Sequence, residues 1–445
     1  MPTQEVARVA CSSALLRRGG HRPHRVLLDG GGEDSWGDGV VLYAHSPVAT
    51  LTAYASGWAR CSAAGDARWR WGDPLALWQK FVDAARAENA LAGGGIVTAL
   101  SYDLKHAVER LPRRLPWLQQ PVLFAACYDW AYRADWRTQR ARITAADAAR
   151  LGAELAWHAR ADRPAAERSP HRDLGPRRAI GQRAYGAMLE RAQEYIAAGH
   201  VYQVNLAQPF RVAAAQVDGA ALVAAWSERY PMPYAAYVDA GDFALVSNSP
   251  ECFLRVEGED VATFPIKGTR RGATEAAELV SDAKERAEHV MIVDLERNDL
   301  GRVCVTGSVE AGPLFAVRAY PLLTHMVSEV RGRLRPGTSL SDVLRATFPG
   351  GSVTGAPKIR AMQIIEELEP APRGFYTGAI GWTEPDGRTT FNLAIRTATL
   401  DAQGLTYWAG GGIVADSRAD SEYAESLLKA EALARALAAM EKVRG

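Results

Sequence analysis

The sequence predicts an α+β protein in which layered antiparallel β-sheets are flanked by helices. Short apolar runs recur between turns that contain Gly, Asp or Pro, as is typical of strands. Longer segments that carry apolar residues at helical spacing alternate with these runs. The chain has 445 residues, of which 48% are hydrophobic and 23% charged, and this composition is typical of a globular enzyme with a substantial core.

The first 135 residues are expected to form an N-terminal region made mainly of strands. Apolar runs predict three strands, at Val40–Tyr43, Gly95–Tyr102 and Val122–Trp130. A helix is expected at Pro74–Ala90. From 136 to 178 the composition shifts to Arg, Ala and Asp, which indicates a linker or excursion. One surface helix, Ala145–Ala161 with Thr144 as its N-cap, is expected within it.

Residues 179–440 are expected to form the catalytic domain. Periodicity predicts five helices, at Ile180–Ala198, Glu275–Asn298, Leu340–Thr347, Ala356–Glu367 and Ser421–Lys442. Thr274 is a suitable N-cap for the second of these. Strands are expected at Tyr234–Val238, Phe243–Ser247, Phe253–Val256, Val261–Ile266, Gly378–Glu384, Thr390–Leu400 and Thr406–Gly410. The first four of these strands form two predicted hairpins.

Charge and cysteine content exclude several classes of protein. The net charge is +1, which gives no indication of a nucleic-acid partner. Five scattered cysteines without C-x-x-C spacing argue against a disulfide framework and a zinc site, and they fit a reducing cytoplasm. The N-terminus lacks the basic region of a signal peptide, and no apolar run is long enough to span a membrane. We therefore expect a cytoplasmic enzyme without a membrane partner.

Two carboxylate pairs stand at i, i+3 spacing on predicted helices. Glu285 and Glu288 form one pair and Glu422 and Glu425 the other, so each pair lies on one helix face. Converging helices that each supply one or two glutamates would suit Mg²⁺, which takes few carboxylates and keeps places for water or substrate. Lys429, one turn after Glu425, would suit an anionic substrate. The alternative is that both pairs are solvated helix faces.

Glycine clusters and one arginine suggest how an anion could be bound. Gly355 precedes a predicted helix and could offer backbone N–H groups to a carboxylate, but a nucleotide P-loop is rejected because Gly-Lys-Ser/Thr is missing. The three glycines Gly410–Gly412 follow a strand, and they indicate either a bend or close approach of backbone to a ligand. Arg396, on the predicted strand, is a possible bidentate carboxylate donor or a structural residue.

Lys267 is the candidate nucleophile. It is one of only seven lysines in a chain that otherwise uses Arg, and it lies between Ile266 and Gly268 in Pro-Ile-Lys-Gly-Thr. Desolvation there would lower its pKa and favour the neutral amine that a nucleophile requires. Glu251, at a strand start in Ser-Pro-Glu-Cys, is a candidate general acid. Spacing alone leaves open that Lys267 is an ordinary lysine.

Long motifs resemble the chorismate-utilising enzymes, which include anthranilate, aminodeoxychorismate, isochorismate and salicylate synthases. The resemblance is strong over about 180–435 and weaker over the first 135 residues, where Ser-Tyr-Asp-Leu (101–104) and Tyr-Asp-Trp (128–130) are familial. The motifs are Tyr-Gln-Val-Asn-Leu-Ala-Gln (202–208), Glu-His-Val-Met-Ile-Val-Asp-Leu-Glu-Arg-Asn-Asp-Leu (288–300), His-Met-Val-Ser (325–328), Gly-Ala-Pro-Lys (355–358) and Gly-Gly-Gly-Ile-Val-Ala-Asp-Ser (410–417). The resemblance implies the fold of anthranilate synthase component I.

The resemblance also implies roles for individual residues. Glu288 and Glu425 would bind Mg²⁺, with Glu285 and Glu422 nearby. The metal, Lys429 and the Gly410–Gly412 backbone would hold the ring carboxylate of chorismate, and Gly355 and Thr269 would also bind the substrate. Tyr376 and Arg396 would take the enolpyruvyl carboxylate. Glu251 would protonate the departing 4-hydroxyl, His325 would lie close to the ring, and Lys267 would form a covalent adduct.

Two positions distinguish the branches of the family. Members that add water use a Lys base where this chain has Gln203, which makes isochorismate and salicylate synthesis unlikely. Anthranilate synthases have Ala in the slot of Lys267, whereas the branch that makes 4-amino-4-deoxychorismate for 4-aminobenzoate and folate has Lys. That branch is expected here, with ammonia from a separate glutamine amidotransferase subunit. Anthranilate synthesis and a silent chorismate-binding paralogue are the alternatives.

One feature departs from the family pattern. Relatives commonly carry Ser after a Leu-Leu pair near the N-terminus, where it lines a tryptophan site. Here Leu27-Leu28-Asp29 runs directly into glycines. Whether tryptophan binds the N-terminal region is therefore an open question.

Overall fold

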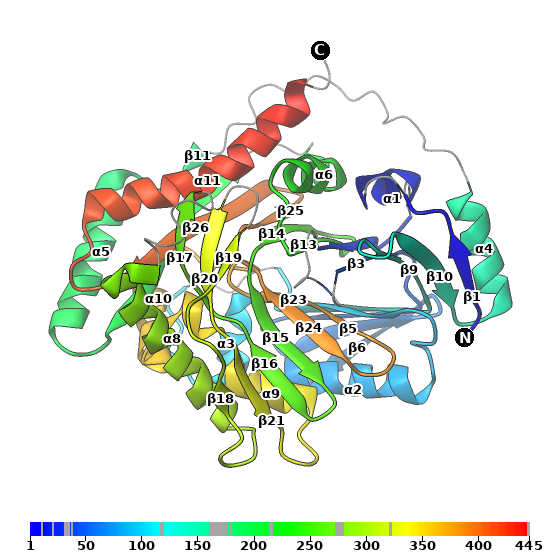
Figure 1. Ribbon diagram of the computed structural model, residues 1–445, viewed down its shortest axis with the longest axis horizontal. Helices are drawn as coiled ribbons and strands as arrows, with labels where there is room; N and C mark the ends of the chain where they lie inside the picture. Colours follow the sequence, from blue (N-terminus) through cyan, green and yellow to red (C-terminus); the bar gives the residue numbers. More distant parts are fainter. Residues whose placement is uncertain are drawn as a thin grey trace.

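Two large antiparallel sheets face each other and form the body of the protein (Figure 1). The computed structural model describes residues 1–9, 12–19, 22–30, 36, 39–115, 120–159, 177–178, 180–212, 217–271, 280–319 and 323–442. The α+β class with layered antiparallel sheets is confirmed. Among the described helices, none combines the length and apolarity needed to cross a bilayer.

The first sheet has twelve strands, and its order is not the chain order. The path runs through β1 (Thr3–Val6), β10 (Arg140–Ala145), β9 (Trp130–Asp135), β3 (Val40–Ala44), β2 (Val26–Asp29), β13 (Tyr234–Asp239), β14 (Ala244–Ser249), β25 (Thr397–Asp401), β26 (Gly404–Ile413), β12 (Gln203–Val212) and β11 (Arg177–Arg178). The short strand β22 (Gly355–Ala356) also pairs with β12. The long β12–β26 pair joins Asn205 to Gly412 and Leu206 to Gly411, so the glycine run lies within a strand.

The second sheet has eleven strands. Its order is β18 (Glu310–Ala311), β21 (Val330–Arg333), β16 (Asp260–Thr263), β15 (Cys252–Glu257), β24 (Thr389–Leu393), β23 (Ala379–Thr383), β7 (Gly95–Leu100), β8 (Leu123–Tyr128), β4 (Ala49–Ala53), β5 (Trp58–Ala63) and β6 (Asp66–Trp71). A third sheet of β17 (Ile266–Arg271), β20 (Leu323–Val327) and β19 (Ala316–Ala319) lies beside it. Both large sheets combine strands from the first 135 residues with strands after residue 179.

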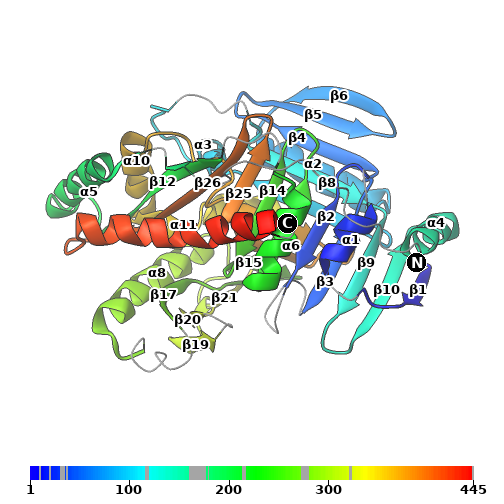
Figure 2. The same cartoon turned by 90° about the horizontal axis from the view of Figure 1, so that it is seen from above.

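Helices cover the outer faces of the two sheets. The last helix, α11 (Ala419–Lys442), runs across the first sheet beside α5 (Gln182–Ala197) and α6 (Gly219–Arg229) (Figure 2). The second sheet is covered by α2 (Pro74–Ala87), α8 (Ala283–Gly301) and α9 (Leu340–Thr347). Helix α10 (Lys358–Leu368) packs on β12 and β22. The remaining described helices are α1 (Ser12–Gly19), α3 (Lys105–Val108) and α4 (Ala148–His158).

Apolar side chains from the two sheets meet in the space between them. Leu28 and Leu42 of the first sheet belong to one cluster with Phe124 and Trp382 of the second, and all four are almost fully buried. Each such side chain removed from water contributes about 1.5–3 kcal/mol. This cluster therefore fixes the position of the two sheets, and of the loops at their ends, relative to each other.

The break in the predicted strand Thr390–Leu400 matters most for the site. The chain leaves the second sheet at the end of β24 and enters the first at β25, so Arg396 lies in the crossing and not on a strand. Arg396 has a φ of +50°, in the left-handed region that L side chains rarely adopt. The prediction of one continuous strand was wrong here, because the first part of the segment belongs to the second sheet and the last part to the first sheet.

Part of the expected linker is also regular structure. Residues 140–145 form β10, and the helix within 136–178 spans Ala148–His158. Its N-cap is Asp147, whose side chain accepts a hydrogen bond from the Arg150 N–H at 2.8 Å, and not Thr144, which pairs with Thr3 in the sheet. Thr274 and Glu275, expected at the start of the long helix, lie outside the described residues.

Candidate active site

The Glu251 carboxyl group is buried where β14 leads into β15. Its side chain is 5% exposed, and Oε1 accepts a hydrogen bond from the Ser352 hydroxyl at 2.7 Å. Burial raises the pKa of Glu251 to about 7, although the Ser352 hydroxyl, the Lys267 charge and the Ile266 N–H each act to lower it. At neutral pH this carboxyl group can therefore both donate and accept a proton, as a general acid–base residue requires.

Lys267 projects from β17 into a partly buried position among charged side chains. Desolvation lowers the pKa of its ammonium group, and the positive charge of Lys429 lowers it further. The carboxylates of Glu288, Glu251 and Glu285 oppose this shift. The pKa of Lys267 therefore depends on Glu251 just before β15, on the two glutamates of α8 and on Lys429 of α11. A lowered amine pKa is the property that a lysine nucleophile needs.

His325 lies on β20, next to the strand that carries Lys267. A bulge between Lys267 and Thr269 brings Thr269 opposite His325, and Gly268 in the bulge has a φ of +68°. His325 Nδ1 is 3.4 Å from the Gly268 carbonyl oxygen, so this nitrogen is the donor. Burial and the Arg396 charge lower the pKa of His325 to about 4, which leaves the imidazole neutral at physiological pH. The Thr269 side chain lies outside the described part of the chain.

Gly411 lies against the charged residues at the start of α11. A Cβ at this position would be 3.2 Å from Glu422 Oε2, 3.8 Å from Glu425 Oε1 and 3.8 Å from Lys429 Nζ. Lys429 Nζ donates to the Gly410 carbonyl at 2.8 Å and pairs with Glu425 Oε1 at 2.7 Å. The backbone of the glycine run therefore lies next to Lys429 and to the carboxylates of Glu422 and Glu425. This position favours a ligand contact over a simple bend.

The donor set around Lys267 suits a hard cation. Glu288 and Glu285 on α8 act on Lys267 together with Lys429, which is itself paired with Glu425 on α11. Carboxylate oxygens are the ligands that Mg²⁺ prefers, and one or two of them suffice when a substrate supplies others. The four glutamates do not lie within 4.8 Å of one another as a group. This spacing leaves room for substrate or water oxygens among the ligands of a cation.

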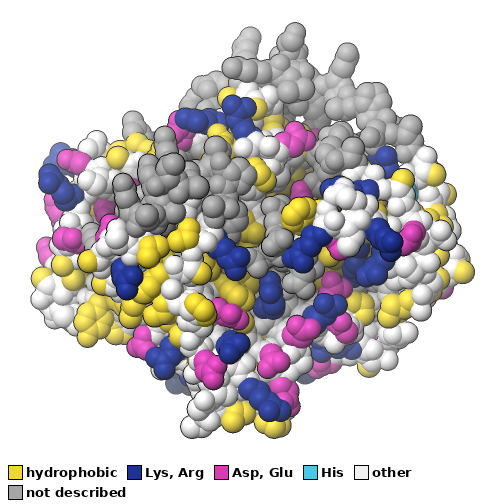
Figure 3. Space-filling model, in the orientation of Figure 1, with side chains coloured by type: hydrophobic (Ala, Val, Ile, Leu, Met, Phe, Trp, Pro, Cys, Tyr) yellow, Lys and Arg dark blue, Asp and Glu magenta, His cyan; other side chains and the backbone are white. Residues whose placement is uncertain are grey.

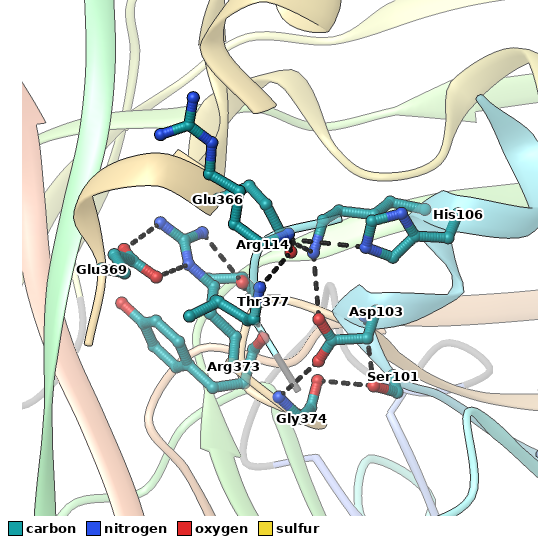
Figure 4. Close-up of polar contacts among 12 residues, drawn as sticks. Ser101, Asp103, His106, Arg114, Glu366, Glu369, Arg373, Gly374 and Thr377 are labelled. Atoms are coloured by element: carbon teal, nitrogen blue, oxygen red, sulfur yellow. Dashed lines mark hydrogen bonds and ion pairs between the residues drawn. The ribbon is translucent and has the colours of Figure 1, made fainter. Parts of the chain in front are cut away.

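A second group of possible metal ligands is already neutralised. Among the described residues, Asp103, His106 and Glu366 are the three whose ligand atoms lie within 4.8 Å of one another. The buried Lys105 ammonium lies between them, 2.9 Å from Asp103 Oδ1 and 3.1 Å from Glu366 Oε2. Figure 4 shows this arrangement. The lysine takes the place of a cation, so this cluster is structural.

Arg396 and Tyr376 lie beside the crossing between the two sheets. Burial lowers the pKa of the Arg396 guanidinium, and the nearby Tyr407 phenol opposes this shift. No ion pair joins it to a carboxylate of the described residues. The Tyr376 ring stacks on Trp408 at a centroid distance of 6.2 Å and an angle of 10°. A desolvated guanidinium of this kind is suited to an anionic ligand.

A buried polar network holds the segment that carries Tyr376 (Figure 4). Arg373 donates to both oxygens of Glu369 at 2.7 and 2.9 Å, and to Thr377 Oγ1 at 3.1 Å. The next residue, Gly374, donates its N–H to Asp103 Oδ2 at 2.8 Å. Residues 373–377 are thus fixed from α10 on one side and from residues 101–105 on the other. The familial Ser-Tyr-Asp-Leu motif has this structural role.

The structure brings most of the predicted site residues together. Glu251, Glu288 and Lys429 each act on Lys267. His325 and Arg396 are electrostatic neighbours, and Gly411 adjoins the α11 group. Gly355 has a φ of +136°, and a Cβ added to it would lie 2.2 Å from the Gln203 carbonyl oxygen. The backbone of β12 therefore leaves no room for a side chain at this position. Gly355 pairs with Val204 of β12.

Sequence reasoning missed three residues that shape the site. Ser352, whose hydroxyl donates to Glu251, lies three residues before Gly355, where the sequence indicated only the backbone N–H groups near Gly355 as ligand contacts. Arg373 and Glu369 form the buried pair behind Tyr376. Their i, i+4 spacing was a usable signal, but it did not indicate that the pair is buried.

Comparisons with known proteins identify relatives over nearly the whole chain. The family pattern described as chorismate binding enzyme matches residues 24–435. Aminodeoxychorismate synthase component 1 of Escherichia coli (strain K12) is 34% identical over 434 residues, which cover 94% of each chain. Anthranilate synthase component 1 of Aquifex aeolicus (strain VF5) is 44% identical over 263 residues, covering 57% of this chain and 53% of the relative.

Solved structures support the same relationship. Anthranilate synthase component I from Streptococcus pneumoniae TIGR4 superposes with a TM-score of 0.74 at 30% sequence identity. The match covers 90% of this chain and 93% of the relative. The architecture described above is therefore that of these solved relatives.

Proposed function

Because the chain belongs to the chorismate-binding enzyme family, we propose that it converts chorismate and ammonia to 4-amino-4-deoxychorismate through a covalent adduct on Lys267. One observation carries the choice of product. The chain has a lysine of lowered pKa beside a buried carboxyl group whose pKa is about 7. A nucleophilic amine and an acid are the two groups that displacement of a ring hydroxyl needs.

The first step forms the adduct. The neutral Lys267 amine attacks C2 of the ring, both conjugated ring double bonds shift by one position, and the C4–O bond breaks. Glu251 gives its proton to the departing hydroxyl, which leaves as water. The lysine nitrogen then loses a proton to solvent or to a carboxylate of the site. The neighbouring glutamates that act on Lys267 stabilise the positive charge on nitrogen before that proton is lost.

The second step reverses the displacement. Ammonia attacks C4, both ring double bonds shift back, and the C2–N bond to Lys267 breaks. Glu251, now ionised, takes a proton from the new ammonium group, and the departing lysine nitrogen regains the proton that it lost. The sum is chorismate plus ammonia giving 4-amino-4-deoxychorismate plus water. Glu251 is returned to its acid form.

Substrate binding uses two separate groups of residues. The guanidinium of Arg396 and the Tyr376 phenol would hold the enolpyruvyl carboxylate, since Arg396 has a desolvated charge without a carboxylate partner in the described chain. Lys429 and the backbone at Gly410–Gly412 would hold the ring carboxylate. Mg²⁺ held by Glu288 and Glu425, with Glu285 and Glu422 nearby, would supply electrostatic stabilisation of that carboxylate. His325, neutral and buried, would contact the ring.

Ammonia would come from a second protein. The relatives are named component 1, which implies a further component, and we propose a glutamine amidotransferase subunit in that role. The product would serve 4-aminobenzoate and folate synthesis.

Anthranilate synthesis is the second candidate, because the Aquifex relative has the higher identity over its matched part. Lys267 distinguishes the two functions: direct addition of ammonia at C2 needs no lysine there. A product assay separates them. Purified protein with chorismate, Mg²⁺ and ammonium chloride should give 4-amino-4-deoxychorismate, which an added aminodeoxychorismate lyase converts to 4-aminobenzoate. Fluorescent anthranilate in the absence of the lyase would refute the proposal.

A further inference from the structure

Strand β12 carries two neighbouring buried amide side chains, Gln203 and Asn205, which have polar atoms without a hydrogen-bond partner among the described residues. They are called the amide row below. Gln203 is fully buried, and neither its Oε1 nor its Nε2 has a hydrogen-bond partner among the described residues. Asn205, two residues on, is 9% exposed, and its Oδ1 also has no such partner. Leaving a buried polar atom unsatisfied costs about 1–3 kcal/mol. Three such atoms in one row indicate a polar species that is absent from the protein itself.

The row begins at the surface. Tyr202, which precedes Gln203, is 74% exposed, and its N–H donates to the Ala356 carbonyl at 2.8 Å. The Gln203 amide then fills the space that a side chain at position 412 would occupy, since a Cβ on Gly412 would be 2.3 Å from Gln203 Nε2. The absence of a side chain at Gly412 therefore makes room for this amide beside the glycine run.

The row ends at the general acid. Residues i and i+2 of a strand point to the same face about 6–7 Å apart, so Asn205 lies next to Gln203 on one face of β12. Asn205 Nδ2 donates to the Ser352 carbonyl at 3.5 Å, and the Ser352 hydroxyl donates to Glu251 Oε1 at 2.7 Å. The unpaired oxygens of Gln203 and Asn205 thus lead stepwise from the β12 end of the sheet to Glu251.

We propose that this row is the route by which ammonia reaches the reacting carbon, with Gln203 and Asn205 as relay acceptors. The inference rests on the proposed function, because it requires a reaction that consumes ammonia beside Glu251. Neutral ammonia has three N–H donors, and the row offers amide oxygens that need donors. The row reaches Glu251 from β12 through Ser352, whereas Lys267 belongs to β17.

The route explains a requirement of the second step. Ammonia that attacks C4 must arrive next to Glu251, because this carboxylate takes the proton that the new ammonium group releases. Delivery past Asn205 and Ser352 places the nucleophile next to that base. Ammonia is neither oxidised nor reduced along the row; it exchanges hydrogen bonds and stays neutral until it reacts.

Release of the adduct tests the route. Chorismate and Mg²⁺ are mixed with the full-length protein until the Lys267 adduct has formed, and ammonium chloride is then added while the adduct is followed by rapid-quench intact mass spectrometry. In Asn205→Leu, which keeps the size but removes the acceptor, the adduct should form within twofold of the wild-type rate. Its release by ammonium should slow at least tenfold. Gln203→Leu should behave in the same way.

Gln208→Leu is the matched control. Gln208 lies on the same strand, is fully buried and also has an Oε1 without a partner among the described residues, but its Nε2 donates to Ser426 on α11 at 2.8 Å. Its release rate should equal that of the wild type. Wild-type release in Asn205→Leu and Gln203→Leu, with normal adduct formation, would overturn the route alone. Absence of any adduct in the wild type would overturn the proposed function.

Discussion

The burial of Glu251 predicts that the catalytic acid destabilises the protein at alkaline pH. Raising the pKa of this carboxyl group from 4.5 to about 7 costs its ionised form about 3 kcal/mol, at 1.36 kcal/mol per pH unit. Below pH 4.5 the group is protonated in both the folded and the unfolded chain. Between pH 4.5 and 7 the unfolded chain loses the proton while the folded chain keeps it. Stability is therefore lost as pH rises through this window, and the loss is complete above 7.

Replacing Glu251 by Gln removes this loss, because the amide is neutral at every pH and can still accept the Ser352 hydroxyl hydrogen bond. The change in stability relative to wild type should therefore rise by about 3 kcal/mol between pH 4.5 and 8. Activity should fall by about 10²–10⁴-fold, the usual effect of losing a general acid. The variant would be a more stable and far less active protein.

Urea unfolding of both proteins at several pH values measures the effect. The exposed Glu257, at the end of β15, provides the control, since Glu257→Gln should change the free energy of unfolding little at any pH. A stability difference between Glu251→Gln and wild type that does not vary from pH 4.5 to 8 would show that the carboxyl group is not desolvated. The acid role assigned to Glu251 would then lose its basis.

Three further changes are expected to have distinct effects. Lys105→Met leaves the buried Asp103 and Glu366 without their cation and should lower the free energy of unfolding by about 3–5 kcal/mol, measured in urea; little loss would contradict the structural role of the cluster. Gly411→Ala adds a Cβ 3.2 Å from Glu422 Oε2 and should raise the Mg²⁺ concentration needed for half-maximal activity, and an unchanged requirement would separate the glycine from the metal site. Arg396→Leu should raise the KM for chorismate about 10–100-fold, as loss of a charged hydrogen bond of about 1.5–3 kcal/mol implies; an unchanged KM would exclude a substrate contact.

The sequence predicted the α+β class and most element positions, because the alternation of short apolar runs and helical periods reports burial directly. It could not predict the crossing at Arg396. The segment Thr390–Leu400 has the same local pattern whether it lies in one sheet or passes between two. The backbone of Arg396, with a φ of +50°, is held by tertiary contacts that the sequence does not reveal. The mixing of early and late strands in both sheets is likewise a property of long-range pairing.

Sequence motifs predicted those site residues whose side chains have a distinctive chemistry. Lys267 and Glu251 were identified by residue type and local context, and the structure supports their pairing. The face of hydrophobic side chains over the region of α8, α10 and the small sheet, seen in Figure 3, was not predicted. Nor were the Gln203 amide and the Asn205 Oδ1, which lack hydrogen-bond partners among the described residues, because such an atom is left without a partner only by the surrounding fold.

The most direct test of the account is the fate of Lys267 when chorismate is supplied without ammonia. Protein incubated with chorismate and Mg²⁺ is denatured, digested and examined by mass spectrometry. The account predicts a chorismate-derived adduct, less one water, on the peptide that contains Lys267, and none in Lys267→Ala. An adduct on another residue, or full production of 4-amino-4-deoxychorismate by Lys267→Ala, would contradict the claim that this lysine is the nucleophile.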